Sequence, residues 1–231
     1  MKKPVKEQIE ATANAIMQLP RDSWSKEQAP KIAQSILDYA KSVDAKKRSE
    51  QTFVELNQLG IEMASLSDSA TLRKELRGLG VAVFVVKTVH EQLRYDTTRL
   101  VVEKGKPFEI LFENTDGMPH NLVVVEPNKH MEIGMAAQTM PPGEKDKKGR
   151  AYLPKNFKIL EATKLLEAGE KEKLQMKAPD QEGEYEYVCT FPGHWMIMWG
   201  KLIVTKDVDA YLQANPTFTL PPPGMPAPAA H

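Results

Sequence analysis

The ten residues Cys189-Thr-Phe-Pro-Gly-His194-Trp-Met-Ile-Met198 place a thiol, an imidazole and a thioether on one short loop. Cys189 is the only cysteine among 231 residues. The chain therefore excludes an internal disulfide, a c-type haem attachment and any iron–sulfur or zinc site built only of cysteines. Sulfur ligands favour Cu(I), and imidazole suits both Cu(I) and Cu(II). The loop indicates a soft metal site, with copper favoured, that still needs a second histidine.

His120 is the candidate for that second histidine. It lies in Met118-Pro-His-Asn121, directly before the apolar run 122–125. A histidine at the mouth of one strand can face a Cys-to-His loop that leaves a neighbouring strand. We therefore expect His120 to lie close to Cys189 and His194.

The segment between residues 81 and 207 has the pattern of a β domain. Phe108, Ile110 and Phe112 alternate with a set that includes Glu109 and Glu113, as in a half-buried strand. Other apolar or β-branched runs lie at 81–86, 100–102, 122–125 and 202–204, and apolar or aromatic residues alternate at 174–176 and 185–189. At least six short strands predict an antiparallel β-sandwich or barrel. Residues 131–170 interrupt the strands and are interpreted as a flap, packed in part by Met131, Met135 and Met140.

Residues 1–80 have apolar residues at helical spacing and predict about four short helices, the last capped by Ser69. This segment contains no His and no Cys, so we expect it to pack or dock rather than to bind a metal. Residues 208–231 are rich in proline and predict an extended tail or linker.

Bulk composition narrows the possible partners. Lys+Arg and Asp+Glu both total 31, which gives a net charge of zero and argues against nucleic acid as a partner. No apolar run approaches the ~20 residues of a transmembrane helix. The first residues contain no apolar core of a signal peptide. We expect either a protein that stays where it is made or a piece of a longer one.

The combination of Pro-His-Asn before a strand and Cys-Thr-Phe-Pro-Gly-His, with a methionine four positions later, resembles the cupredoxin family of type 1 blue copper proteins. The long interval from His120 to Cys189 is similar to the azurin and auracyanin branch. The resemblance covers roughly residues 82–206. It implies an antiparallel Greek-key β-sandwich with a flap, mainly β, preceded here by an α-helical extension.

The resemblance also implies four copper ligands: His120, Cys189, His194 and Met198. The two imidazoles and the thiolate would form a trigonal plane, with the thioether as a weak axial ligand. By the same resemblance, the backbone N–H groups of Asn121 and Phe191 would donate to the sulfur. The Asn121 side chain would tie the two ligand loops together. Pro119 stands where azurin has glycine, so the resemblance does not extend to a fifth contact from its carbonyl.

The expected function is that of a single-electron carrier cycling between Cu(II) and Cu(I), not an enzyme. Copper enzymes that reuse this domain need further histidine clusters, which five histidines without a His-x-His pair do not supply. The expected partners are a redox donor and acceptor, such as a cytochrome c or a dehydrogenase domain. Trp195 and Met118 are expected to form an apolar electron-transfer surface, and His90 and His130 to lie on the surface.

Two further expectations concern context. The alternative function is a non-redox module that stores or delivers copper, or holds zinc with the same residues, and recombinant protein can carry zinc in place of copper. The helical lead-in also resembles arrangements in larger exported bacterial redox proteins, in which a cupredoxin portion serves a fused enzyme. That resemblance implies a periplasmic or other extracytoplasmic location.

Overall fold

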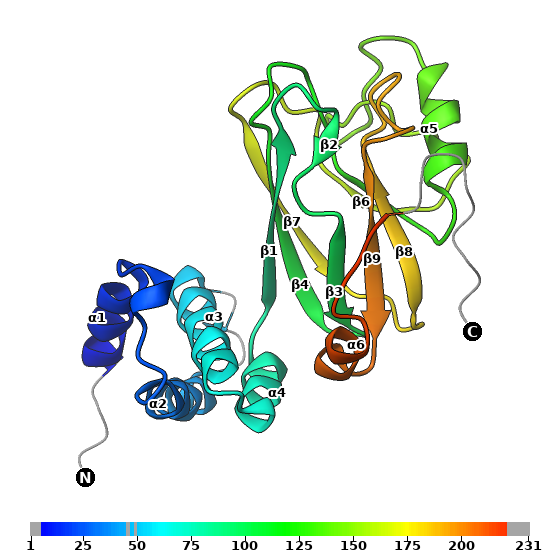
Figure 1. Cartoon of the computed structure of the whole chain (residues 1–231). Helices are drawn as coiled ribbons and strands as arrows, with labels where there is room; N and C mark the ends of the chain where they lie inside the picture. Colours follow the sequence, from blue (N-terminus) through cyan, green and yellow to red (C-terminus); the bar gives the residue numbers. More distant parts are fainter. Residues whose placement is uncertain (1–5, 45–46, 49, 221–231) are drawn as a thin grey trace. The chain divides into compact units, whose positions relative to one another are not determined.

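The computed structural model describes residues 6–44, 47–48 and 50–220. The chain divides into two compact units, Met1–Val83 and Phe84–His231 (Figure 1). The first is helical and the second is built mainly of strands. Within the described residues, no helix is both long enough and apolar enough to span a membrane.

The helical unit contains α1 (Lys6–Met17), the short 3-10 helix η1 (Arg21–Ser23), α2 (Ala29–Ser42), α3 (Gln51–Leu66) and α4 (Ala70–Leu79). Its core is made of the apolar faces of the four α-helices. Gly60 permits a close approach, since a Cβ there would lie 2.9 Å from Cγ2 of Ile36. The Ser69 hydroxyl accepts the N–H of Leu72 and so caps α4 as its sequence indicates.

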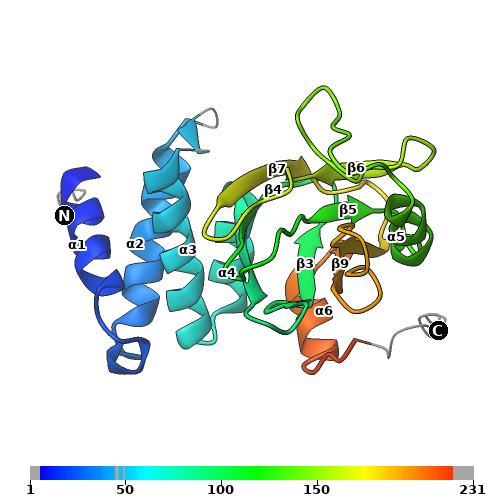
Figure 2. The same cartoon turned by 90° about the horizontal axis from the view of Figure 1, so that it is seen from above.

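The strands of the second unit form two sheets that face each other (Figure 2). The first sheet has the order β2 (Arg94–Tyr95), β1 (Ala82–Val89), β4 (Pro107–Glu113) and β7 (Lys171–Lys177). The second has the order β3 (Arg99–Glu103), β9 (Trp199–Thr205), β8 (Gly183–Val188), β5 (Val123–Val125) and β6 (Ile159–Ala162). The predicted fold class, a β-sandwich with helical elements, is confirmed.

Alternation along the strands separates two apolar layers. Val124 and Tyr187 point into the core between the sheets, which also contains Cys189. Val123 and Val125 point the other way and pack with Ile133 of helix α5 (His130–Gln138). The second sheet is therefore covered on both faces, which explains why β5 reads as an uninterrupted apolar run.

One strand pair departs from the expected antiparallel arrangement. β3 lies parallel to β9, with Arg99 opposite Lys201 and Glu103 opposite Thr205. A parallel pair requires a long connection, and here most of the β unit lies between the two strands. Apolar alternation reports which face of a strand is buried but carries no information about its direction.

The predicted flap contains a strand, and the predicted tail contains a helix, that their sequences do not indicate. Residues 131–170 include most of α5 and the strand β6, which pairs with β5 at the edge of the second sheet. Helix α6 (Val208–Ala214) lies within the predicted tail, where the Asp207 side chain accepts the N–H of Ala210. The proline-rich residues 221–231, which end at His231, lie outside the described residues.

The methionines of the flap are less buried than expected. Met131 and Met135 are both exposed, and only Met140 packs against an apolar cluster. The helical spacing of Met131 and Met135 places both on the same outer face of α5, which explains why neither fills the core.

His130 is buried, and its expected position on the surface is wrong. Its ring stacks on Trp199 with centroids 4.1 Å apart, and its Nδ1 lies 2.9 Å from Oε2 of Glu186. Lys201 donates to the other oxygen of Glu186 at 3.0 Å. These side chains form a charged cluster beneath α5 because β8 and β9 present Glu186 and Lys201 on the outer face of the sheet.

Candidate copper site

Backbone hydrogen bonds fix the two segments that carry the predicted ligands. His120 and Leu166 exchange two backbone hydrogen bonds, at 3.0 and 2.8 Å, just before β5 begins. Cys189 directly follows β8, and its N–H donates to the Met198 carbonyl at 2.9 Å. The N–H of Met198 donates in turn to the carbonyl of His194 at 2.9 Å. The loop is thus closed on itself before any side chain contributes.

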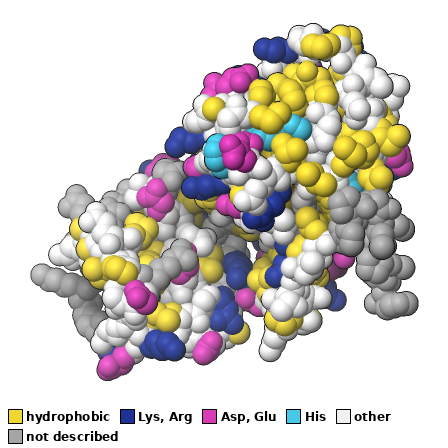
Figure 3. Space-filling model, turned by 45° about the horizontal axis from the view of Figure 1, so that its top comes forward, with side chains coloured by type: hydrophobic (Ala, Val, Ile, Leu, Met, Phe, Trp, Pro, Cys, Tyr) yellow, Lys and Arg dark blue, Asp and Glu magenta, His cyan; other side chains and the backbone are white. Residues whose placement is uncertain are grey.

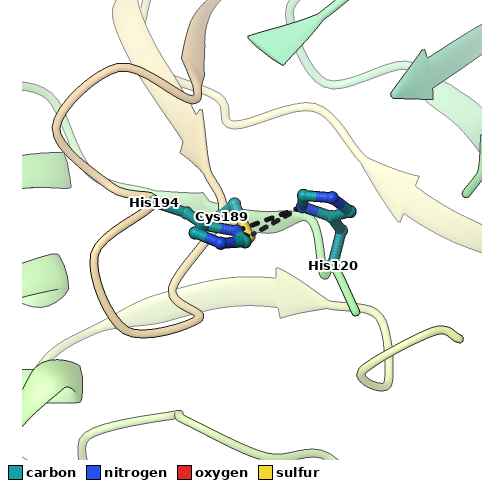
Figure 4. Close-up of side chains that lie close together, drawn as sticks. All are labelled: His120, Cys189 and His194. Atoms are coloured by element: carbon teal, nitrogen blue, oxygen red, sulfur yellow. Dashed lines mark hydrogen bonds between the residues drawn. The ribbon is translucent and has the colours of Figure 1, made fainter. Parts of the chain in front are cut away.

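Three side-chain donors converge between these segments (Figure 4). Sγ of Cys189 lies 3.8 Å from Nδ1 of His120 and 3.6 Å from Nδ1 of His194. The two Nδ1 atoms lie 3.2 Å apart. Metal–nitrogen bonds of about 2.0–2.1 Å and metal–sulfur bonds of about 2.3 Å imply donor separations of roughly 3.3–3.8 Å for tetrahedral to trigonal angles. The two sulfur–nitrogen distances lie within this range and the nitrogen–nitrogen distance lies just below it, so the three donors can share one metal ion.

The donors lie in a dry environment. Cys189 and His120 are 0% exposed and His194 is 3% exposed. Met198 is also fully buried, in the same apolar cluster as Cys189. Two imidazoles, a thiol and a nearby thioether form a donor set suited to copper. In the part of the chain that the structure describes, no other group of three or more His, Cys, Asp or Glu side chains has the spacing of a metal site.

Residues 82–205 match the family described as copper binding proteins, plastocyanin/azurin family. The chain belongs to this copper-binding family. The resemblance to cupredoxins is therefore confirmed, and His120, Cys189, His194 and Met198 form a candidate copper site in a member of that family.

Each of the similar curated proteins matches about half of this chain. Auracyanin-A of Chloroflexus aurantiacus is 30% identical over 129 residues, which cover 55% of this chain and 76% of that protein. Azurin of Pseudomonas aeruginosa is 30% identical over 122 residues, 49% of this chain and 78% of the azurin. Outer membrane protein H.8 of Neisseria meningitidis is 32% identical over 124 residues, and the chain spans 62% of its length.

Solved structures of auracyanins are also similar. Auracyanin A of Chloroflexus aurantiacus, a "blue" copper protein, is 29% identical with a TM-score of 0.49, covering 55% of this chain and all of that one. Reduced auracyanin of Roseiflexus castenholzii is 28% identical with a TM-score of 0.47, covering 55% of this chain and 99% of the other.

Burial sets the protonation of the cupredoxin donors. It lowers the pKa of His194 to about 4, and nearby His120 adds to this effect. Burial also lowers the pKa of His120, against the opposing hydrogen bond and charge of Asp116. The thiol of Cys189 has its pKa raised to about 12 by burial, although backbone N–H groups of Asn121 and Phe191 hydrogen-bond the sulfur and lower it. Both imidazoles are neutral at pH 7, as metal binding requires.

Asn121 and Phe191 both contact residues of the candidate site. The Asn121 side chain donates to Oγ1 of Thr190 and accepts the N–H of Thr190, both at 2.8 Å. The Phe191 ring lies against the His194 ring, with centroids 4.8 Å apart. Thr190 completes this link between the ligand segments, and sequence analysis did not select it, because a lone threonine next to a ligand has no distinctive pattern.

Asp116 is a second residue that sequence analysis did not select. Its Oδ2 lies 3.1 Å from Nε2 of His120. Burial alone would raise the pKa of Asp116, but hydrogen bonds from the Glu91 N–H, His120 and the Gly117 N–H lower it to about 2. The only signal in the sequence is a carboxylate four positions before a predicted metal-ligating histidine.

The predicted apolar surface is only partly exposed. Trp195 is 8% exposed, and its Nε1 donates to Oε1 of Gln138 at 2.9 Å. Trp195 is therefore an interior residue and adds no exposed edge. Met118, Met196 and Ile197, which flank the ligands in sequence, are exposed by 44, 48 and 45%. Figure 3 shows hydrophobic side chains gathered around histidines on the end of the cupredoxin unit that faces the viewer.

Proposed function

We propose that this chain is a one-copper electron carrier, and not an enzyme, with His120, Cys189, His194 and Met198 as its copper ligands. The observation that carries the proposal is the convergence of two Nδ1 atoms and one Sγ atom at 3.2–3.8 Å in the interior of a cupredoxin unit. Copper bound there would supply one-electron exchange between Cu(II) and Cu(I).

The chain itself contributes a rigid, water-free site. The Leu166 bridge holds His120, the Cys189–Met198 backbone bond closes the loop, and the Asn121–Thr190 pair joins the two segments. Donors held in this way move little when the charge of the site changes. A small rearrangement means a small barrier to electron transfer.

The exposed apolar residues support a docking role for this end of the unit. Met118, Met196 and Ile197 offer a small apolar surface next to the ligand segments, and weak redox complexes use interfaces of modest size. We propose a redox protein as donor and another as acceptor, such as a cytochrome c or a dehydrogenase domain. An electron-transfer role for Trp195 would run through the interior rather than through an exposed ring edge.

The context of the carrier is also part of the proposal. We propose that residues 81–207 act as the copper domain, with 1–80 as a helical extension and 208–231 as a tail or linker that contains α6. An extracytoplasmic location, in the periplasm or at the cell surface, is supported by the similarity to a protein named for the outer membrane.

The test is the absorption and electron paramagnetic resonance spectrum of the copper-loaded protein. A thiolate bound to Cu(II) gives an intense visible band, and Cys189→Ser must remove it. Met135→Leu, which removes an exposed sulfur of the flap, must leave it unchanged. The same ligands also suit zinc, so a protein that binds zinc but stays colourless with Cu(II) would indicate the non-redox alternative instead.

A further inference from the structure

Asp116 lies behind the ligand His120, on the side away from Cys189. Its Oδ2 is 3.1 Å from Nε2 of His120, while Nδ1 of the same ring faces Sγ of Cys189 at 3.8 Å. Both members of the pair are buried, with Asp116 5% and His120 0% exposed. The two ring nitrogens of His120 therefore have separate partners, a carboxylate on one side and the metal-binding donors on the other.

The other carboxylate oxygen is held by the fold. Oδ1 of Asp116 accepts the backbone N–H groups of Glu91 at 3.1 Å and Gly117 at 2.8 Å. Nδ1 of His90 lies 3.2 Å from the same oxygen, and the N–H of Asp116 donates to Oδ1 of Asn114 at 3.0 Å. The carboxylate is thus oriented by its own surroundings and does not depend on a bound metal.

This arrangement decides which nitrogen of His120 carries the proton. An ionised carboxylate only accepts hydrogen bonds, so Nε2 must be the N–H and Nδ1 must present its lone pair to the metal pocket. We propose that Asp116 is a positioning residue that fixes the metal-binding tautomer of His120 before copper arrives. Partners of this kind orient a metal-ligating histidine and raise its basicity. The inference rests on the proposed copper function and adds to it.

The variant Asp116→Asn separates the positioning role from a purely structural one, because it keeps the loop contacts but changes the partner of His120. The asparagine oxygen can still accept the N–H groups of Glu91 and Gly117, so the loop contacts survive. The amide nitrogen then faces Nε2 of His120, and because it only donates, Nε2 must accept. The proton of His120 moves to Nδ1, into the metal pocket.

The experiment compares wild type, Asp116→Asn and Asp180→Asn as metal-free, histidine-labelled proteins at pH 8. Asp180 is exposed and paired with Lys177, so its variant controls for the loss of one negative charge. Nitrogen NMR of the imidazole ring gives the tautomer, and titration with Zn²⁺ gives an affinity without any redox step. Urea unfolding establishes that each variant folds.

We expect the Nε2–H tautomer of His120 in wild type and Asp180→Asn, and the Nδ1–H tautomer in Asp116→Asn. The Zn²⁺ affinity of Asp116→Asn should fall by about 10–100-fold, the usual effect of removing such a partner. An unchanged tautomer and affinity in Asp116→Asn would overturn the proposal. If Asp116→Asn does not fold, the wild-type protein still tests the proposal. An Nδ1–H tautomer of His120 in the wild-type protein would overturn it.

The tautomer is read without metal, so the result is independent of the proposed function. A wild-type protein that has the Nε2–H tautomer but gives no coloured copper form would support the role of Asp116 and contradict the electron carrier.

Discussion

Asn121 and Thr190 exchange two hydrogen bonds of 2.8 Å each, although 69 residues separate them in the chain. Both residues are fully buried. Each lies next to a predicted ligand, so the pair holds His120 and Cys189 at a fixed separation. The candidate copper site is therefore held together by a contact that does not include a metal.

Replacement of Asn121 with alanine should destabilise the metal-free protein. The variant leaves the buried N–H of Thr190 without an acceptor, which costs about 1–3 kcal/mol of unfolding free energy. Urea unfolding followed by tryptophan fluorescence measures this. Thr190→Val, which loses only the hydroxyl acceptor, should cost less. A double variant no worse than Asn121→Ala alone would establish that the two residues act as a pair, and a fully additive double variant would contradict it.

Met198 and Met196 offer a matched test of the axial ligand. Met198 is fully buried beside Cys189, and Met196 is 48% exposed. Met198→Leu removes a weak sulfur donor and leaves an apolar side chain, so the reduction potential of the copper protein should rise while the visible band persists. Met196→Leu should leave the potential unchanged. Voltammetry checks both, and a shift only in the Met196 variant would reverse the assignment.

Gly134 should not tolerate a side chain. A Cβ at this position of α5 would overlap Cβ and Cγ of Trp195. Gly134→Ala should therefore lower the unfolding free energy by about 1–3 kcal/mol, the usual cost of overpacking. Gly78→Ala is the control, since its Cβ meets nothing within 4 Å, and it should stabilise helix α4 by about 0.5–1 kcal/mol. Equal effects in urea unfolding would contradict the packing of α5 against Trp195.

Lys201 should be needed for the stability of the buried charged cluster. Lys201 and Glu186 are each 2% exposed and joined by a hydrogen bond of 3.0 Å. Lys201→Met leaves the buried Glu186 carboxylate without its lysine partner, so we expect a loss of about 3 kcal/mol. Lys158→Met breaks the exposed pair with Glu126 and should have little effect. Chemical unfolding of both variants measures the two losses of unfolding free energy. Similar losses would contradict the expectation that the buried pair matters more than the exposed one.

Glu186 should also make the free energy of unfolding depend on pH in the acidic range. Burial alone raises its pKa, but the contact with His130 and the charge of Lys201 lower the pKa below its ordinary value. The pKa of Glu186 is lower in the folded than in the unfolded protein. Its contribution to the free energy of unfolding is therefore fully present above the unfolded pKa of about 4.3 and is lost as the pH falls through the folded pKa. The stability difference between wild type and Glu186→Gln should shrink from pH 5 to pH 2. A constant difference in urea unfolding over this range would contradict it.

Much of the site was predictable because its chemistry is concentrated in short segments. The loop from Cys189 to Met198 and the run before β5 specify donor types and spacing, and the structure brings His120, Cys189 and His194 together. The alternation of Phe108, Ile110 and Phe112 likewise predicted a strand, now part of β4.

The features that sequence reasoning missed depend on distant partners. His130 is buried by Glu186 and Trp199, which no local pattern connects to it. Asp116 gains its role only because the turn after β4 places it behind His120. Trp195 follows a ligand in sequence, yet helix α5 covers it through Gln138. Local propensity predicts a segment's own conformation but not which other segment will cover it.

The parallel pairing of β3 with β9 has a consequence for how the protein is made. Arg99 pairs with Lys201, so two strands that lie side by side are synthesised 201 − 99 = 102 residues apart. β9 lies between β3 and β8, so the second sheet stays open until the last strand leaves the ribosome. Contacts between residues so distant in sequence form slowly. The second sheet can therefore be completed only after β9 has been synthesised, and the last candidate ligand, Met198, directly precedes that strand.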